Sequence, residues 1–206
     1  FWVGDGVGVL VTAPLLLAAA HADSRREFAR IVRKPETITQ ATLLAGGTDI
    51  GLWVNKAMRD LGDVLYLGDI TELKTITADA TTLTIGAGAS LESAWQALVQ
   101  RWPQLTDLWL RFASPPVRNA GTMGGNVANA SPAGDTLPVL AVAEATVVLR
   151  SVGGERRVGF ASFYTGYRQT VMRADELIVA IDVPPVEGRQ WFRKVGTRAA
   201  QVISKV

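Results

Sequence analysis

Short apolar runs, each bounded by glycine, proline or other turn-forming residues, recur along the chain and predict a series of short strands. Two pairs of these runs flank the turn residues Asp79-Ala80 and Gly153-Gly154, which predicts two hairpins. Strands, hairpins and helices follow one another without a regular βα alternation, so we expect an α+β fold rather than a doubly wound sheet. The predicted strands span residues 7–12, 43–45, 64–67, 73–77, 82–85, 146–150, 156–158, 177–183 and 191–195.

Apolar residues at helical spacing are found in fewer places. After Ser90, which can cap a helix, they recur on one face as far as Val99, and Pro103 ends the pattern. Further helices are predicted over 15–20 and from a cap at Asp135 through Ala143. For the tryptophans, packing in the core is the simpler interpretation and stacking on a cofactor is the alternative. The aromatic residues expected in the core or beneath the second hairpin are Trp95, Trp102, Trp109, Phe160, Phe163 and Tyr164.

The run 112–138 differs from the segments on both sides, because it contains four glycines, four prolines and three asparagines. That density of breakers disfavours any regular helix or strand, so we predict a series of tight turns. Successive N–H groups of such turns can line a concavity that binds a phosphate or diphosphate, and Arg118 would add attraction. The alternative is a long structural loop, and no P-loop or GxGxxG pattern decides between the two.

A second glycine run, TLLAGGTDIG at 42–51, begins as a short apolar strand. Apolar residues then recur at helical spacing over 50–57, and Thr48 or Asp49 would cap that helix. Phosphates bind where strand ends meet glycine turns and helix N-termini. Two such runs in one chain suggest a dinucleotide that is held from two sides.

These runs also resemble a known family. AGGTD followed by GLWVNKAMRDL, and then RFASPPVRNAGTMGGNVANASPAGDTLPVL, are similar to the FAD-binding subunit or domain of xanthine dehydrogenase, a molybdenum hydroxylase. The resemblance covers about residues 41–206, whereas residues 23–40 do not match. It implies a fold of the vanillyl-alcohol-oxidase type with FAD between two subdomains. The implied parts are an N-terminal α/β subdomain over 1–62, a larger α+β FAD-binding subdomain over 63–190 and the start of a truncated C-terminal domain over 191–206.

The resemblance further implies which residues contact a non-covalently bound FAD. Lys194 would place a positive charge near the flavin, and the alternative is a strand-edge lysine in solvent. The residues implied to wrap the diphosphate are Leu43, Leu44, Ala45, Gly46, Gly47, Thr48, Asp49, Ile50, Thr122, Gly124, Gly125 and Asn126. Other FAD contacts are implied for Phe112, Gly121, Asn129, Asp135, Ile178 and Lys194.

The function that the resemblance implies is electron transfer from iron–sulfur clusters through FAD to NAD⁺, during the oxidation of hypoxanthine and xanthine. The clusters and the molybdenum cofactor would lie on partner chains or on domains outside this sequence, in a cytoplasmic enzyme. The choice between NAD⁺ and oxygen as the electron acceptor stays open.

Three other interpretations remain. The first is the FAD subunit of another molybdenum hydroxylase such as carbon monoxide dehydrogenase, which resembles AGGQS and GGSxAHADP where this chain has AGGTD and GGNVANASP. The second is a stand-alone flavin oxidase of the same fold, a class that often attaches flavin through His or Cys. The third is a non-catalytic interaction module in which both glycine runs are structural.

Composition narrows these alternatives. With no cysteine and one histidine among 206 residues, the chain cannot hold a thiolate-bound iron–sulfur cluster, a multi-histidine metal site or a Cys-His pair. A net charge of +2 without a block of basic residues that would attract phosphates gives no indication of nucleic-acid binding. The early run LLLAAAHA lacks the preceding positive charge of a signal peptide and is too short to span a membrane. A hard cation at Asp49 or Asp135 is a minor alternative. Because the chain begins at Phe1 and stops within a pattern, we expect a fragment of a longer protein.

Overall fold

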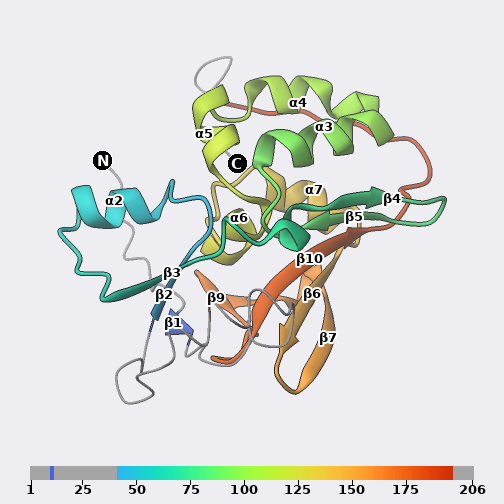
Figure 1. Ribbon diagram of the computed structural model, residues 1–206. Coiled ribbons are helices and arrows are strands. Elements are labelled where there is room, and N and C mark those ends of the chain that lie inside the picture. Colours follow the sequence, from blue (N-terminus) through green and yellow to red (C-terminus); the bar gives the residue numbers. More distant parts are fainter. Residues whose placement is uncertain (1–9, 12–40, 197–206) are drawn as a thin grey trace.

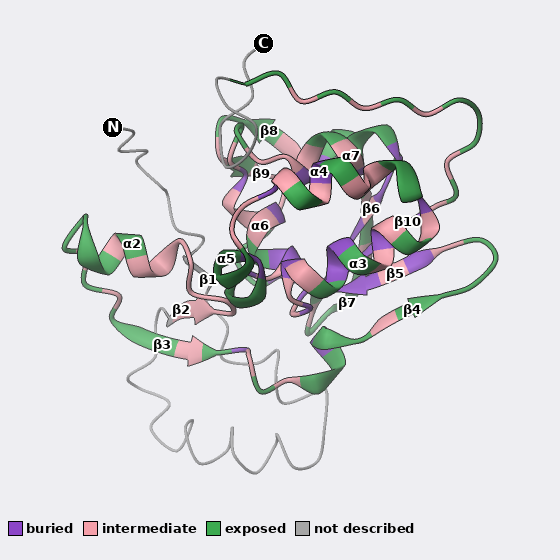
Figure 2. Cartoon of the chain, turned by 90° about the horizontal axis from the view of Figure 1, so that it is seen from above, coloured by how far each residue is buried: buried purple, intermediate pink, exposed green. Residues whose placement is uncertain are grey.

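The structure is a computed structural model that describes residues 10–11 and 41–196 of the chain (Figure 1). A small sheet with helix α2 lies on one side, a larger sheet lies on the other, and α5 and α6 lie near the centre (Figures 1 and 2). The helix predicted over 15–20, the single histidine and the basic segment at 23–40 lie outside the described residues. This arrangement of separate sheets and helices is α+β, as predicted.

The small sheet contains β1 (Leu10–Val11), β2 (Ala41–Leu44) and β3 (Asp63–Tyr66). β1 pairs antiparallel with β2, and β2 pairs parallel with β3 across a connection that carries α2 (Ile50–Asn55). The Thr42 hydroxyl donates to the Leu61 carbonyl at 2.8 Å, which ties the return of the chain to β2. The expected boundary between the two subdomains lies between residues 62 and 63, so β3 follows it and nevertheless pairs with β2. The division into subdomains stays a prediction.

The larger sheet is antiparallel throughout, in the order β4-β5-β10-β6-β7. Both predicted hairpins are confirmed, and β10, the buried strand predicted near the end of the chain, lies between them. The first hairpin begins later than predicted, because Thr71–Lys74 forms the 3-10 helix η2 and the Leu73 carbonyl accepts from the Gly88 N–H at 2.7 Å. The strands are β4 (Ile76–Ala78), β5 (Leu83–Gly86), β6 (Thr146–Ser151), β7 (Gly154–Gly159) and β10 (Leu177–Val183).

Most helices pack on one face of the larger sheet (Figure 1). The longest, α3, begins after Ser90, whose hydroxyl accepts from the Ser93 N–H at 3.0 Å, and ends at Arg101 before Pro103. These features agree with the predicted cap and stop. The helices here are α3 (Leu91–Arg101), η3 (Pro103–Leu105), α4 (Thr106–Arg111), α5 (Pro115–Ala120), α6 (Met123–Asn129) and α7 (Thr136–Val142).

The prediction that the breakers of 112–138 disfavour any regular helix is wrong for residues 115–129, most of which form α5 and α6, whereas α7 begins after Asp135 as predicted. Its breakers lie where short helices tolerate them: Pro115 and Pro116 occupy the first turn of α5, where a proline costs no hydrogen bond. Gly124 lies inside α6, and a Cβ there would come within 2.6 Å of the Ala87 Cβ. The glycine is therefore required for α6 to pack closely on the end of β5.

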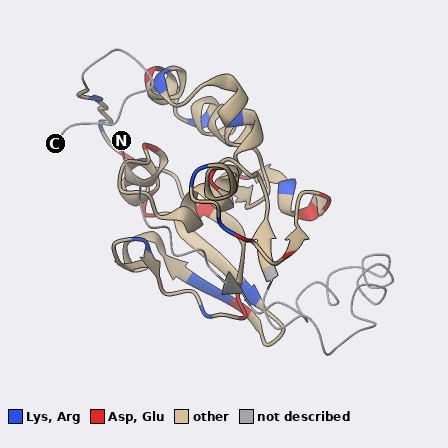
Figure 3. Cartoon of the chain, turned by 90° about the vertical axis from the view of Figure 1, so that its left-hand side faces the viewer, with Lys and Arg blue, Asp and Glu red and all other residues tan. Residues whose placement is uncertain are grey.

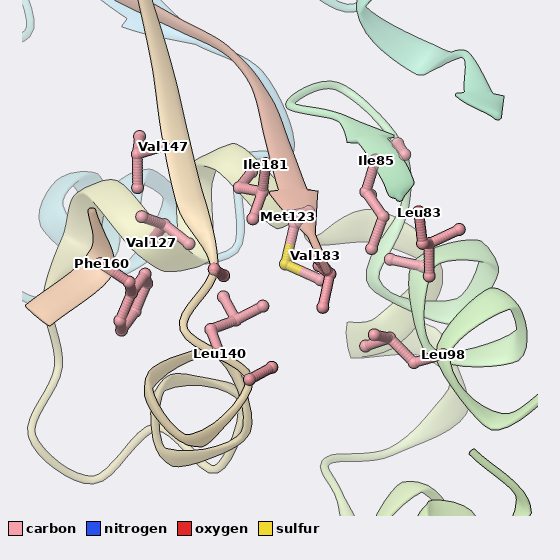
Figure 4. Packing of buried hydrophobic residues seen from close by; sticks show 14 of the residues in the cluster. Leu83, Ile85, Leu98, Met123, Val127, Leu140, Val147, Phe160, Ile181 and Val183 are labelled. Carbon is pink, nitrogen blue, oxygen red and sulfur yellow. The ribbon is translucent and has the colours of Figure 1, made fainter. Parts of the chain in front are cut away.

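The core lies between these helices and the larger sheet (Figures 2 and 4). Trp95 on α3 is fully buried, and its ring centroid lies 5.5 Å from that of Phe112. Trp102 is buried and Trp109 is half-buried against the same cluster, so the core interpretation of the tryptophans is confirmed. The labelled residues of Figure 4 show how both layers contribute to it: Leu83, Ile85, Leu98, Met123, Val127, Leu140, Val147, Phe160, Ile181 and Val183.

A short hairpin that follows β7 in the chain was not predicted from the sequence. It comprises β8 (Tyr164–Gly166) and β9 (Gln169–Thr170), after the 3-10 helix η4 (Phe160–Ser162). Phe160 and Phe163 are buried beneath it, and both rings meet that of Tyr164 edge-on. The hairpin is only a few residues long and lacks alternation, which is why the sequence pattern does not reveal it.

The predicted strand at 191–195 is wrong, because residues 184–196 run over the surface without regular structure. Trp191, which was expected to lie in that strand, is 75% exposed. The segment is held by side chains instead: Gln104 donates to Gln190, and Lys194 pairs with Asp135. No helix among residues 41–196 is long and apolar enough to cross a membrane. In the view of Figure 3, Lys and Arg are dispersed among Asp and Glu.

Candidate functional site

The two glycine runs, far apart in the sequence, meet in the structure. The turn after β2 lies directly on the junction between α5 and α6, where a Cβ at Gly46 would come within 2.3 Å of the Ala120 carbonyl oxygen. The same Cβ would lie 3.0 Å from the Thr122 backbone nitrogen. No residue with a side chain fits this contact, so Gly46 is what allows the small sheet to dock on the central helices.

A pocket opens beside this contact, between the small sheet, α6 and the first residues of β10. It contains every residue that the resemblance implies except Leu44, Phe112, Asp135 and Lys194. Its walls are mostly apolar or glycine, with Thr48, Asp49, Asn126 and Asn129 among the polar residues. Sequence reasoning missed ten lining residues: Thr42, Trp53, Leu67, Leu73, Ala87, Gly88, Leu91, Ala128, Met172 and Leu177.

The first glycine run contributes consecutive residues to the pocket lining whose backbone N–H groups have no described acceptor. Among the described residues, nothing accepts a hydrogen bond from the N–H groups of the five consecutive residues 46–50, all of which line the pocket. The chain turns here from β2 into α2. The first N–H groups of this region that donate to backbone carbonyls are those of Gly51, Leu52 and Trp53. Five adjacent N–H groups at a turn and a helix start form a site for an anion.

The second run does not present such donors, which corrects the expectation drawn from its composition. The Met123 N–H donates to the Ala89 carbonyl at 2.9 Å, and the Gly124 N–H donates to the Ala87 carbonyl at 2.7 Å. The next N–H, of Gly125, donates to the Thr122 hydroxyl, which caps α6 at 3.2 Å. The second run therefore supplies a closely packed wall rather than a second row of N–H groups.

Arg118 does not face the pocket, so its predicted attraction for an anion is wrong. Its guanidinium is buried at the junction of α3 and α5, where it pairs with Glu92 and donates to the Phe112 carbonyl at 2.7 Å. The Trp109 ring lies 6.0 Å from the guanidinium carbon. The half-buried Glu92 carboxylate and backbone carbonyls satisfy this cation, which makes it part of the helical packing.

Asp49 contributes a carboxylate to the pocket lining. It precedes α2 without forming a side-chain cap bond, so its carboxylate is left facing other partners. Burial raises the pKa of the Asp49 carboxyl, while the charge of Arg168 and a hydrogen bond from Asn129 act to lower it. The side-chain oxygen of Asn126, another lining residue, is buried and has no hydrogen-bond partner among the described residues. Such an orphaned acceptor marks a place for a ligand donor.

The four implied residues outside the pocket have other positions. Leu44 continues the small sheet, where its carbonyl accepts from the Leu67 N–H at 2.8 Å. Phe112 lies in the core against Trp95. Asp135 and Lys194 form an ion pair whose side chains are almost completely buried. Their contact with a cofactor stays a prediction. Within residues 41–196, no three His, Asp or Glu side chains gather as a metal site.

Comparison with known proteins gives a consistent result. The family described as "FAD binding domain in molybdopterin dehydrogenase" matches residues 17–186. The chain is 31% identical over 178 residues to the nicotinate dehydrogenase FAD-subunit of Eubacterium barkeri, covering 80% of this chain and 58% of that one. It is 29% identical over 164 residues to the xanthine dehydrogenase/oxidase of Gallus gallus, covering 74% of this chain and 12% of that one.

A solved structure shares the fold. Carbon monoxide dehydrogenase from Hydrogenophaga pseudoflava, in a form that lacks the Mo-pyranopterin moiety of the molybdenum cofactor, superposes with a TM-score of 0.72 at 28% identity. The match covers 79% of this chain and 58% of the chain in that structure. The present chain thus spans about three fifths of the length of these FAD-subunit and structural relatives.

Proposed function

Because the chain belongs to the family of FAD-binding domains of molybdopterin dehydrogenases, we propose that it binds FAD without a covalent bond and serves as an electron-transfer component of a molybdenum hydroxylase. The observation that supports this most directly is the row of five N–H groups at 46–50 from which no described residue accepts a hydrogen bond, since such a row suits the diphosphate of FAD.

The residues present fit FAD in three respects. The turn offers a row of donors with no protein acceptor among the described residues, as a diphosphate requires. Asn126 offers a buried acceptor without a described partner, and largely apolar walls suit aromatic rings. The 206 residues of this sequence include no cysteine, so this part of the protein cannot attach flavin through sulfur.

The pocket also suggests how FAD lies in the fold. Its lining combines the turn after β2 of the small sheet, residues along α6 and the start of β10 in the larger sheet. FAD bound there would lie between the small sheet and the larger sheet, as in folds of the vanillyl-alcohol-oxidase type. We propose this arrangement for the chain.

The chemistry that FAD supplies when bound is the exchange of one or two electrons. The residues of this chain bind the diphosphate, exclude water with apolar walls and orient the ring system. The iron–sulfur clusters and the molybdenum cofactor would belong to partner chains or to further domains, since this sequence has no cysteine to hold a cluster.

For the overall reaction we propose oxidation of xanthine and hypoxanthine with NAD⁺ as the acceptor. The support is local: AGGTD and GGNVANASP resemble the xanthine dehydrogenase pattern rather than the AGGQS and GGSxAHADP pattern of carbon monoxide dehydrogenases. A nicotinate-oxidising enzyme is the second candidate, because the FAD-subunit of nicotinate dehydrogenase matches 80% of the chain.

The test is to isolate the chain with the subunits that accompany it and to measure reduction of NAD⁺ with xanthine, hypoxanthine, nicotinate or carbon monoxide. Turnover of the two purines with NAD⁺ supports the proposal. Turnover confined to nicotinate or carbon monoxide would refute the purine assignment, and turnover with oxygen alone would refute the acceptor.

A further inference from the structure

The one charge in the described pocket lining opposes a diphosphate, although the backbone N–H groups suit it. Among the described residues that line the pocket, the only charged side chain is the Asp49 carboxylate, and none is lysine or arginine. A carboxylate repels the negative charges of a diphosphate, and low polarity in the surroundings strengthens that repulsion. A positive charge close to Asp49 would remove this obstacle.

Arg168 supplies such a charge. It lies at the tip of the β8–β9 hairpin, between Gly166 and Gln169, with a left-handed φ of +53°. Its charge acts on the carboxyl group of Asp49. Its Nε is buried and donates to no described residue. A buried guanidinium N–H without a protein acceptor is costly, and a ligand oxygen is an ordinary way to satisfy it.

The hairpin that carries Arg168 is fixed relative to the pocket. The Tyr164 hydroxyl donates to the Val127 carbonyl of α6 at 2.9 Å, and Val127 neighbours the lining residues Asn126 and Ala128. At the other end of the hairpin, Arg156 donates to the Val171 carbonyl at 3.1 Å and Met172 enters the pocket lining. The hairpin that carries Arg168 is therefore held beside the pocket at both of its ends.

We propose that Arg168 is an affinity-determining residue of the FAD site, which neutralises Asp49 so that the turn at 46–50 can accept a diphosphate through its backbone N–H groups. The inference rests on the proposed binding of FAD. It assigns the role to a residue that belongs neither to the glycine runs nor to the pocket lining, because Arg168 lies on the β8–β9 hairpin.

A double-mutant cycle tests this. The dissociation constant for FAD is measured by equilibrium dialysis for the parent protein, Arg168→Gln, Asp49→Asn and the double variant, in the protein as isolated with any accompanying subunits. We expect Arg168→Gln to weaken binding by at least about tenfold, the effect of losing one charged partner. In the Asp49→Asn background the same change should cost about threefold or less, because no carboxylate remains to be neutralised.

Two further variants control for structure. Arg168→Lys keeps the charge and should retain most of the affinity, whereas Arg189→Gln makes the same change of charge at an exposed residue outside the pocket and should have no effect. Equal affinity of the parent and Arg168→Gln would overturn the inference while FAD binding itself stands. An equal loss in both Asp49 backgrounds would also overturn it, and failure of the parent to bind FAD would refute the proposed function.

Discussion

Gly46 lies so close to Ala120 that a Cβ at residue 46 would come within 2.3 Å of the Ala120 carbonyl oxygen. This contact joins the turn that offers unused N–H groups to the central helices that form the opposite wall. The candidate FAD site therefore depends on close approach of two backbones as much as on any side chain.

Gly46→Ala should release FAD, because the added methyl group must push the turn away from Ala120 and disturb the row of N–H groups. We expect the fraction of protein with bound FAD to fall at least about tenfold, the effect of losing roughly one or two hydrogen bonds to a charged group. Gly51→Ala is the matched control: it lies one turn later in α2, where a Cβ meets nothing within 4 Å, and it should keep its FAD. Full FAD content in Gly46→Ala would contradict the proposed role of this contact.

Phe112 should matter for stability rather than for FAD. It is buried, packs on Trp95 and does not line the pocket, although the resemblance implies contact with FAD. We expect Phe112→Ala to lower the free energy of unfolding by about 3 to 5 kcal/mol, measured by urea denaturation. The dissociation constant for FAD, measured where the variant is folded, should stay within about twofold of the parent value. A selective loss of FAD affinity with unchanged stability would instead favour direct contact.

Lys194 should act mainly through Asp135, because the two almost fully buried side chains form an ion pair. We expect Lys194→Met to lower the free energy of unfolding by about 3 kcal/mol, since removing one partner of a buried pair leaves a costly charge. The double variant Lys194→Met/Asp135→Asn should recover a good part of that loss. If the single and double variants are equally unstable, the pair is not what holds residues 184–196 against α7.

Stability should fall in acid through Glu176. Two hydrogen bonds from Arg156, at 2.6 and 2.8 Å, lower the pKa of the Glu176 carboxyl below its ordinary value near 4.5. A carboxyl with a lowered pKa in the folded state stabilises the protein fully above the unfolded-state pKa, and that contribution is lost as the pH falls through the folded-state pKa. The loss should therefore occur below about pH 4.5.

Glu176→Gln tests this assignment. At pH 7 it should cost about 1 to 2 kcal/mol, a modest value because a third of the Arg156 side chain is exposed to solvent. The variant should also show a weaker decrease of unfolding free energy between pH 5 and pH 3 than the parent does. The same steepness in both proteins would assign the acid sensitivity to other carboxyl groups.

The sequence predicted elements well where a single pattern controlled them. Ser90 and Pro103 mark the ends of α3 because capping and proline geometry are local effects. The turn Gly153-Gly154 likewise identifies the hairpin of β6 and β7. Fourteen of the eighteen implied residues line one pocket, so the two glycine runs do come together, while their contact with FAD stays a prediction.

Prediction failed where tertiary contacts decide the structure. Gly124 suggested a turn, yet it lies inside α6. It is a glycine because Ala87 leaves no room there for a side chain. Arg118 suggested an anion site, yet it forms an ion pair with Glu92, a residue distant in the sequence, within the helical layer. Arg168 was passed over because its importance comes from Asp49, more than a hundred residues earlier. Local pattern carries no information about such pairs.

The most direct test of the account is the absorption spectrum of the purified protein between 300 and 550 nm, followed by heat release and identification of the cofactor. We predict the bands of oxidised flavin, released by heat as FAD with none left attached to the chain. A protein that is colourless as isolated, and that stays colourless and binds nothing when FAD is added, would contradict the claim that the turn at 46–50 holds a diphosphate.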